Sequence, residues 1–165
     1  MKTILSFLLL FSLVSLSAYA QDIKDNDSAK AAKSVFLEIG ANGVTFSANF
    51  DTRFSKKQGG LGMRLGLGFF GGSGAGVLTV PVGLNYLAGK APNFFEAGMG
   101  YTYAKLTSSD EFFSGDGGLL FPSVGYRYQA IGKGIVARIV ISPAINLGVD
   151  GGWLFFGGVS IGYKF

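Results

Sequence analysis

The residues able to do chemistry in this chain are almost all charged, because its 165 residues include no histidine and no cysteine. Without an imidazole, serine and aspartate lack a partner that could act as a base near neutral pH. The thiolate and imidazole ligands of most transition-metal sites are missing too. We therefore expect no enzyme activity, no metal site and no cofactor.

Some charged residues stand out because they occupy alternate positions in segments that are otherwise apolar or rich in glycine. Opposite charges on one face of a sheet can pair with one another, whereas charges lining a passage can guide ions. The set comprises Glu38, Asp51, Arg53, Arg64, Glu96, Arg127 and Arg138, with Lys164 in the same phase near the C-terminus. Their role depends on the elements that carry them.

Those elements are predicted to be strands, because period-two patterns run through the chain from about residue 33. Clusters of Gly, Asn, Asp, Ser and Lys separate the patterns, and no stretch after the first twenty residues has a sustained helical apolar stripe. We predict eight strands, over residues 33–42, 44–55, 60–70, 76–87, 94–106, 119–129, 134–146 and 152–165.

Two features leave the strand pattern open in places. Residues 35–54 could form one long strand with a bulge at Asn42–Gly43, but Asn-Gly is a strong turn signal and an even number of strands leaves both termini on one side. We therefore favour a hairpin. Pro81, Pro122 and Pro143 each remove a ladder donor, which puts the local register in question and suggests bulges.

The two faces of the predicted strands differ in kind. Between residues 61 and 69, bulky apolar residues take the odd positions, whereas glycine and Arg64 take the even ones. A soluble barrel would have to pack the bulky face into a narrow lumen and cover its surface with glycine. A membrane barrel, with the apolar face toward lipid and the small or charged face inside, resolves this difficulty.

A membrane chain without a long apolar helix can satisfy its backbone hydrogen bonds in lipid only by closing a sheet. The predicted fold class is therefore all-β, a transmembrane antiparallel up-and-down β-barrel of about eight strands. Turns near 55–59, 88–93 and 130–133 would be periplasmic, with both termini. Connections near 42–43, 71–75, 107–118 and 147–151 would be external.

With this orientation, lipid-facing aromatic residues form two belts. The outer belt comprises Phe46, Phe69, Tyr101, Tyr103, Trp153 and Phe155, and the periplasmic belt comprises Tyr86, Phe95, Tyr126, Tyr128, Tyr163 and Phe165. The alternating charges then point into the lumen. A gated ion path is one possible role, but we favour a salt-bridge plug, because an eight-stranded barrel is only wide enough for side chains.

The N-terminal segment is typical of a cleaved signal peptide. Lys2 precedes an apolar run from Ile4 to Leu16, and Ala18-Tyr19-Ala20 forms a small-x-small site before Gln21. The run is shorter than the ~20 residues of a spanning helix. We expect a signal peptide at 1–20, a flexible periplasmic lead-in at 21–33 and a barrel at 34–165, located in the cell outer membrane.

Several stretches carry a family resemblance, namely "FLEIGANGVTFSANFDTRF", "VPVGLNYLAGK", "FFEAGMGYTY" and "VGYRYQ". They resemble the small outer-membrane β-barrel proteins of Gram-negative bacteria, similar in architecture to OmpA and OmpX, and look most like the Bacteroidota-type outer membrane beta-barrel family. The closing "VSIGYKF" resembles that family's C-terminal assembly signal. The resemblance implies that the barrel-assembly machinery reads Val159, Ile161, Tyr163 and Phe165.

Two further motifs have competing interpretations. The connection "TSSDEFFSGDGG" is a candidate extracellular binding loop. Its aromatic pair could instead fold onto the barrel rim. The candidate binding residues are Asp110, Glu111, Phe112, Phe113 and Asp116. Residues 66–71 match G-x-G-x-x-G, but no helix follows to bind a phosphate. We expect these glycines to make room in the lumen.

Together these features predict a non-enzymatic outer-membrane β-barrel protein that acts as a structural or surface-interaction scaffold. The alternative is a narrow channel or carrier for a small solute. The expected partners are outer-membrane lipid, the barrel-assembly machinery and an unknown extracellular ligand or protein. Nucleic acid is not expected, because the basic residues are scattered and the chain is exported.

Overall fold

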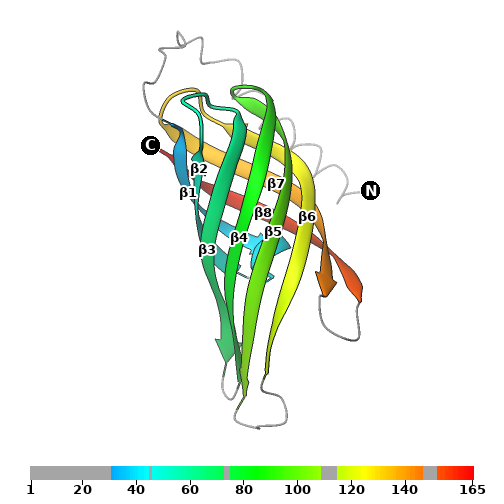
Figure 1. Ribbon diagram of the computed structural model, residues 1–165. Coiled ribbons are helices and arrows are strands. Elements are labelled where there is room, and N and C mark those ends of the chain that lie inside the picture. Colours follow the sequence, from blue (N-terminus) through cyan, green and yellow to red (C-terminus); the bar gives the residue numbers. More distant parts are fainter. Residues whose placement is uncertain (1–30, 45, 73–74, 109–114, 147–151) are drawn as a thin grey trace, which may run out of the picture.

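The computed structural model describes residues 31–44, 46–72, 75–108, 115–146 and 152–165, most of which lie in strands. Eight strands and one short 3-10 turn follow one another along the chain (Figure 1). They are β1 (Lys33–Gly40), η2 (Ala41–Gly43), β2 (Phe46–Arg53), β3 (Gly60–Gly72), β4 (Ala75–Lys90), β5 (Asn93–Ser108), β6 (Gly115–Gln129), β7 (Gly134–Asn146) and β8 (Trp153–Lys164). The predicted all-β fold is confirmed, and so is the hairpin at Asn42–Gly43.

The strands pair in sequence order, and β8 pairs with β1 to close the sheet into a barrel. All neighbouring strands are antiparallel. The closing seam runs from Ser34 opposite Lys164 to Gly40 opposite Gly158. Beyond it, the backbone N–H of Phe165 donates to the carbonyl oxygen of Lys33 at 3.0 Å. The last residue is thus held by the barrel wall, which also removes the free edges that an open sheet would expose along this seam.

Side chains alternate between the two faces of the wall, as the period-two pattern predicts. In β1, Val35, Leu37 and Ile39 are exposed on the outside, whereas Phe36 and Glu38 are buried inside. The same alternation runs along β2 and β3. The barrel therefore has a largely apolar exterior and an interior rich in polar and charged groups, the reverse of a soluble protein.

The three strand prolines do not shift the register, so the bulges that we expected are absent from the described ladders. Pairing between β6 and β7 keeps the same register on both sides of a short unpaired stretch at residues 121–123 and 142–144. In that register Pro122 and Pro143 lie opposite one another. The two backbone N–H groups that proline lacks are therefore absent from the same part of the ladder. Pro81 lies in a similar gap between β3 and β4.

The two ends of the barrel differ. We call the end with the β2–β3, β4–β5 and β6–β7 turns and the C-terminus the turn end, and the opposite end the loop end. Figure 1 shows the turn end uppermost and β3 to β6 extending furthest toward the loop end. The strands β4, β5 and β6 are longer than predicted, because their hairpin ladders continue to Lys90–Asn93 at one end and to Leu106–Gly115 at the other.

Close backbone approach makes glycine necessary at Gly162 in β8. A methyl group there would overlap the carbonyl oxygen of Val35 and the side chain of Phe36 across the closing seam. Gly157, on the outward face of the same strand, has nothing closer than 4.0 Å to the position of such a methyl group.

We predict that Gly162→Ala lowers the free energy of unfolding by about 1 to 3 kcal/mol, because the seam must shift to accept the added atom. Gly157→Ala is the matched control and should leave stability nearly unchanged. Urea unfolding of both variants in lipid vesicles, followed by tryptophan fluorescence, measures the difference. Equal unfolding midpoints for the two variants would contradict the packing at the seam.

Candidate functional site

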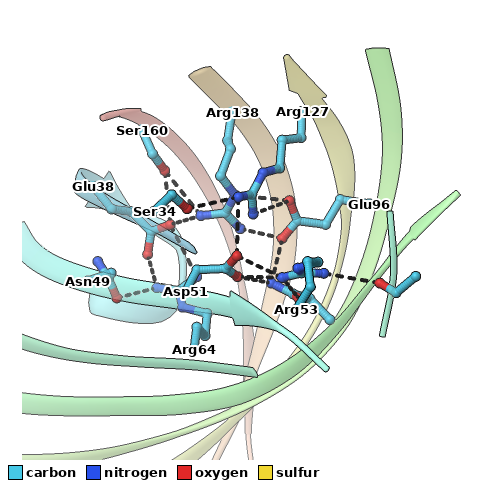
Figure 2. Close-up of polar contacts among 12 residues, drawn as sticks. Ser34, Glu38, Asn49, Asp51, Arg53, Arg64, Glu96, Arg127, Arg138 and Ser160 are labelled. Carbon is cyan, nitrogen blue, oxygen red and sulfur yellow. Dashed lines mark hydrogen bonds and ion pairs between the residues drawn. The ribbon is translucent and has the colours of Figure 1, made fainter. Parts of the chain in front are cut away.

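The centre of the lumen is filled by charged side chains that contact one another (Figure 2). We call this set the lumen cluster. Its members project inward from six different strands, and each is at most 5% exposed. They are Glu38 from β1, Asp51 and Arg53 from β2, Arg64 from β3, Glu96 from β5, Arg127 from β6 and Arg138 from β7. The structure brings together the seven alternating charges that the sequence singles out.

Arg138 bridges two carboxylates that come from opposite parts of the wall. Its Nη1 donates to Glu38 Oε2 at 2.8 Å, and its Nη2 donates to Glu96 Oε1 at 2.6 Å. Its Nε also donates to Glu96 Oε2 at 3.0 Å, so the guanidinium holds Glu96 through two parallel bonds. Glu38 accepts further bonds from Arg64 Nη2 at 2.6 Å and from Ser160 Oγ at 3.1 Å.

Asp51 forms the second centre of the cluster. Both of its carboxylate oxygens lie 2.7 Å from Arg53 Nη2, and Arg127 Nη2 donates to its Oδ1 at 3.1 Å. Asn85 Nδ2 donates to Asp51 Oδ2 at 2.7 Å, and Asn85 Oδ1 accepts a bond from Arg53. The cluster therefore links β2 to β4 and β6 in addition to the wall contacts between neighbouring strands.

Two of the guanidinium groups lie close to one aromatic ring. Phe36 is buried on the inward face of β1, and the Cζ atoms of Arg138 and Arg64 lie 4.7 and 5.4 Å from its ring centroid. A cation over a ring face is stabilised by the ring quadrupole, most strongly where water is excluded. This inward aromatic residue was not among the predicted site residues.

Positive charge exceeds negative charge in the lumen cluster, which has four arginines and three carboxylates and hence a net charge of 4 − 3 = +1. Arg127 is 1% exposed, and its Nε and Nη1 have no hydrogen-bond partner among the described residues. Its Nη1 still lies 3.9 Å from Glu96 Oε2. Loss of any carboxylate would raise the positive excess among these buried groups, which is costly.

The turn end of the lumen is closed by a polar cap around Lys164. Its Nζ donates to Gln58 Oε1 at 2.6 Å and to the carbonyl oxygens of Ala130 and Ile131 at 2.5 and 2.9 Å. Gln58 also donates to the Ile131 carbonyl. The inward direction predicted for Lys164 thus ties β8 to the β2–β3 and β6–β7 turns.

The loop end of the lumen is filled by η2, which folds into the barrel. Ala41 and Asn42 are buried, and the hydroxyls of Thr79 and Thr102 donate to the carbonyl oxygens of Gly43 at 3.1 Å and Asn42 at 2.6 Å. A methyl group at Gly100 of the wall would overlap the Asn42 side chain. The sequence predicts a turn at this position, but nothing in it indicates that the turn enters the lumen.

The other predicted site residues lie elsewhere. Val159, Ile161, Tyr163 and Phe165 all point outward from the last strand and are exposed. Asp110, Glu111, Phe112 and Phe113 lie outside the described residues. Asp116 is within β6, opposite Lys105, so it belongs to the hairpin ladder and not to the predicted loop at 107–118.

Several polar partners of the lumen cluster were missed, although a sequence signal for them exists. Asn49, Asn85 and Ser160 have the same inward phase as the charges and bond to them. In the part of the chain that the structure describes, no group of three or more acidic residues could hold a metal ion. The same part contains no helix long and apolar enough to cross a membrane.

We predict that Arg138→Met lowers the free energy of unfolding by about 3 to 5 kcal/mol, because Glu38 and Glu96 lose their shared partner inside the barrel. Lys133→Met, at an exposed turn just before β7, should change stability by less than about 0.5 kcal/mol. Urea unfolding in vesicles of fixed composition measures both. If the two variants unfold alike, water and not Arg138 balances these carboxylates.

Comparisons with known proteins identify the fold of this chain but not its function. No protein-family model matches the sequence, and no curated protein matches it. Among solved structures, the N-terminal β-barrel domain of Pseudomonas aeruginosa OprF aligns with a TM-score of 0.53 at 12% identity, covering 82% of this chain and 96% of that one.

Two other barrels align less well. The attachment invasion locus protein Ail of Yersinia pestis has a TM-score of 0.47 at 13% identity, covering 82% of this chain and 97% of its own. Neisserial surface protein A has a TM-score of 0.47 at 14% identity, with coverages of 81% and 94%. The likeness to OprF shows the architecture: this chain is an eight-stranded closed antiparallel β-barrel of the kind found in small outer-membrane proteins such as OmpA and OmpX.

Proposed function

We propose that this chain is an outer-membrane β-barrel protein that acts as a non-enzymatic, non-conducting scaffold for its connections at the loop end. The observation that carries the proposal is the closed lumen. The lumen cluster fills its centre, the Lys164 cap closes the turn end, and η2 fills the loop end. Such an interior would stabilise a barrel, and the carboxylates of the lumen cluster are all engaged by arginines.

The exterior supports a membrane location. Outward side chains are large, apolar and exposed on every strand, and water would disfavour such a surface. Exposed aromatic residues gather near both ends of the strands. Tyr86, Phe95 and Tyr126 lie a few residues from the turns, whereas Phe69 and Trp153 lie near the loop end. This distribution is typical of aromatic belts at the two interfaces of a membrane.

The loop end is where we expect interaction with a partner. The long hairpins β3–β4 and β5–β6 extend the wall there, and residues 109–114 connect β5 to β6. Residues on connections at the end of a rigid scaffold are common recognition sites. The candidate extracellular ligand or protein would meet the barrel at this end.

We predict that the purified protein produces no discrete conductance steps in planar bilayers, because the lumen cluster and η2 occupy the interior of the barrel. A folded, inserted barrel is verified separately: protein from vesicles of the same preparation is run on a detergent gel with and without boiling. The two samples should migrate differently. Discrete steps from inserted protein would favour the alternative function, a narrow channel or carrier for a small solute.

The exposed C-terminal aromatic residue provides a test of export and assembly. If the last strand is read by the barrel-assembly machinery, Phe165→Ala should reduce the heat-modifiable protein in outer-membrane fractions several-fold at matched expression. Phe155→Ala is the matched control, since Phe155 is an exposed outward aromatic residue on β8, the strand that ends one residue before Phe165. Equal yields would show that position 165 has no special role in assembly.

A further inference from the structure

The apolar exterior of the barrel has a groove of about 740 Å³ that crosses β8, β1, β2 and β3. Ala48 lies in its centre, and in the register of the sheet it is opposite Leu37 on one side and Leu67 on the other. The neighbouring outward positions carry larger side chains, including Phe50 and Tyr163. The small side chain of Ala48 thus leaves a hollow of the size that binds small ligands.

A lysine lies beyond one end of the groove and is not part of its lining. Lys33 lies on the same outward face of β1 as Val35, which lines the groove, and is two residues closer to the turn end. It is opposite Thr52 in β2, and its carbonyl oxygen accepts the bond from Phe165. Successive residues on one face of a strand are about 7 Å apart, so the ammonium group lies within reach of the end of the groove.

Several exposed lysines lie at this end of the barrel, together with the α-carboxylate of Phe165. Among the described residues, no ion pair joins a carboxylate to the exposed lysines of this end, and the segments 54–59, 91–92 and 130–133 contain no Asp or Glu. The lysines are exposed and come from four places around the rim: Lys33, the pair Lys56 and Lys57, Lys90, and Lys133.

We propose that the groove and Lys33 bind one anionic glycerophospholipid, with an acyl chain along Ala48 and the phosphate at the Lys33 ammonium. This inference rests on the proposed membrane location, which places the groove at the depth of the hydrocarbon and Lys33 at the interface. The apolar lining fits an acyl chain, and the unpaired lysines fit a negative headgroup. Lys56 and Lys57, in the turn that follows β2, add to the positive potential there.

The probe is phosphatidylglycerol, compared with phosphatidylcholine of the same acyl chains. Protein purified from outer membranes in a mild detergent is mixed with equal amounts of both lipids, and native mass spectrometry reports the lipids retained. We expect the wild type to retain one phosphatidylglycerol molecule, several-fold in preference to phosphatidylcholine.

Two pairs of variants separate the parts of the site. Ala48→Phe fills the groove and should abolish retention of the lipid, whereas Ala97→Phe, on the outward face of β5 and away from the groove, should not. Lys33→Ala should remove the preference for phosphatidylglycerol, whereas Lys90→Ala, at the same end but in the β4–β5 hairpin, should keep it.

The outcomes distinguish this inference from the proposed membrane location. Equal retention in all four variants would mean that lipid coats the barrel without a specific site, which overturns the inference. A loss in Ala48→Phe without any effect of Lys33→Ala would overturn its anionic specificity. Protein recovered in aqueous extracts, with no heat-modifiable form, would contradict the membrane location itself.

Discussion

Closure of the sheet, with β8 hydrogen-bonded to β1, is the constraint on which the other features of this protein depend. A closed antiparallel wall satisfies its own backbone groups and divides its side chains into two sets, one inside and one outside. Eight strands enclose a narrow space, so the inward side chains must be small or must pack closely against one another. Glycines such as Gly62 and Gly66 fit that space, because a methyl group at either would overlap the side chain of Arg53 or Asn49.

The lumen cluster is the second consequence of closure. Charged groups in a narrow interior are costly unless each meets a partner, and a planar guanidinium can meet several at once. Arg138 bonds to Glu38 and Glu96, and Arg53 and Arg127 share Asp51. The bonds of Arg127 to Asp51 and of Arg138 to Glu38 and Glu96 join strands that are not neighbours in the wall. The same contacts that stabilise the interior also obstruct it, which is why we infer a scaffold and not a channel.

The exterior obeys a different rule in the membrane location that we propose, because lipid is as apolar as the side chains that would face it. In that location neither leucine nor phenylalanine on this face would be driven to pack against protein, so irregular packing such as the hollow at Ala48 would persist without the cost of an exposed cavity in water. A lipid chain can fill such a hollow. In the site that we propose, Lys33 would select among the surrounding lipids by the charge of their headgroups.

The sequence by itself determined the number of strands, the alternation of faces along them and the identity of the inward charges, because alternation along a strand is a local property that needs no partner. The same alternation places three further polar residues on the inward face, where they could have been predicted too: Asn49, Asn85 and Ser160. Only the tertiary structure decided which charges meet, since Arg138 reaches Glu38 and Glu96 through the relative register of strands far apart in the chain. It also decided that η2 enters the lumen, that the β4, β5 and β6 ladders continue beyond their predicted ends, and that Pro122 and Pro143 share one gap without a bulge. Each of these outcomes depends on the space and the hydrogen-bonding partners that neighbouring strands provide, and those exist only once the sheet has closed.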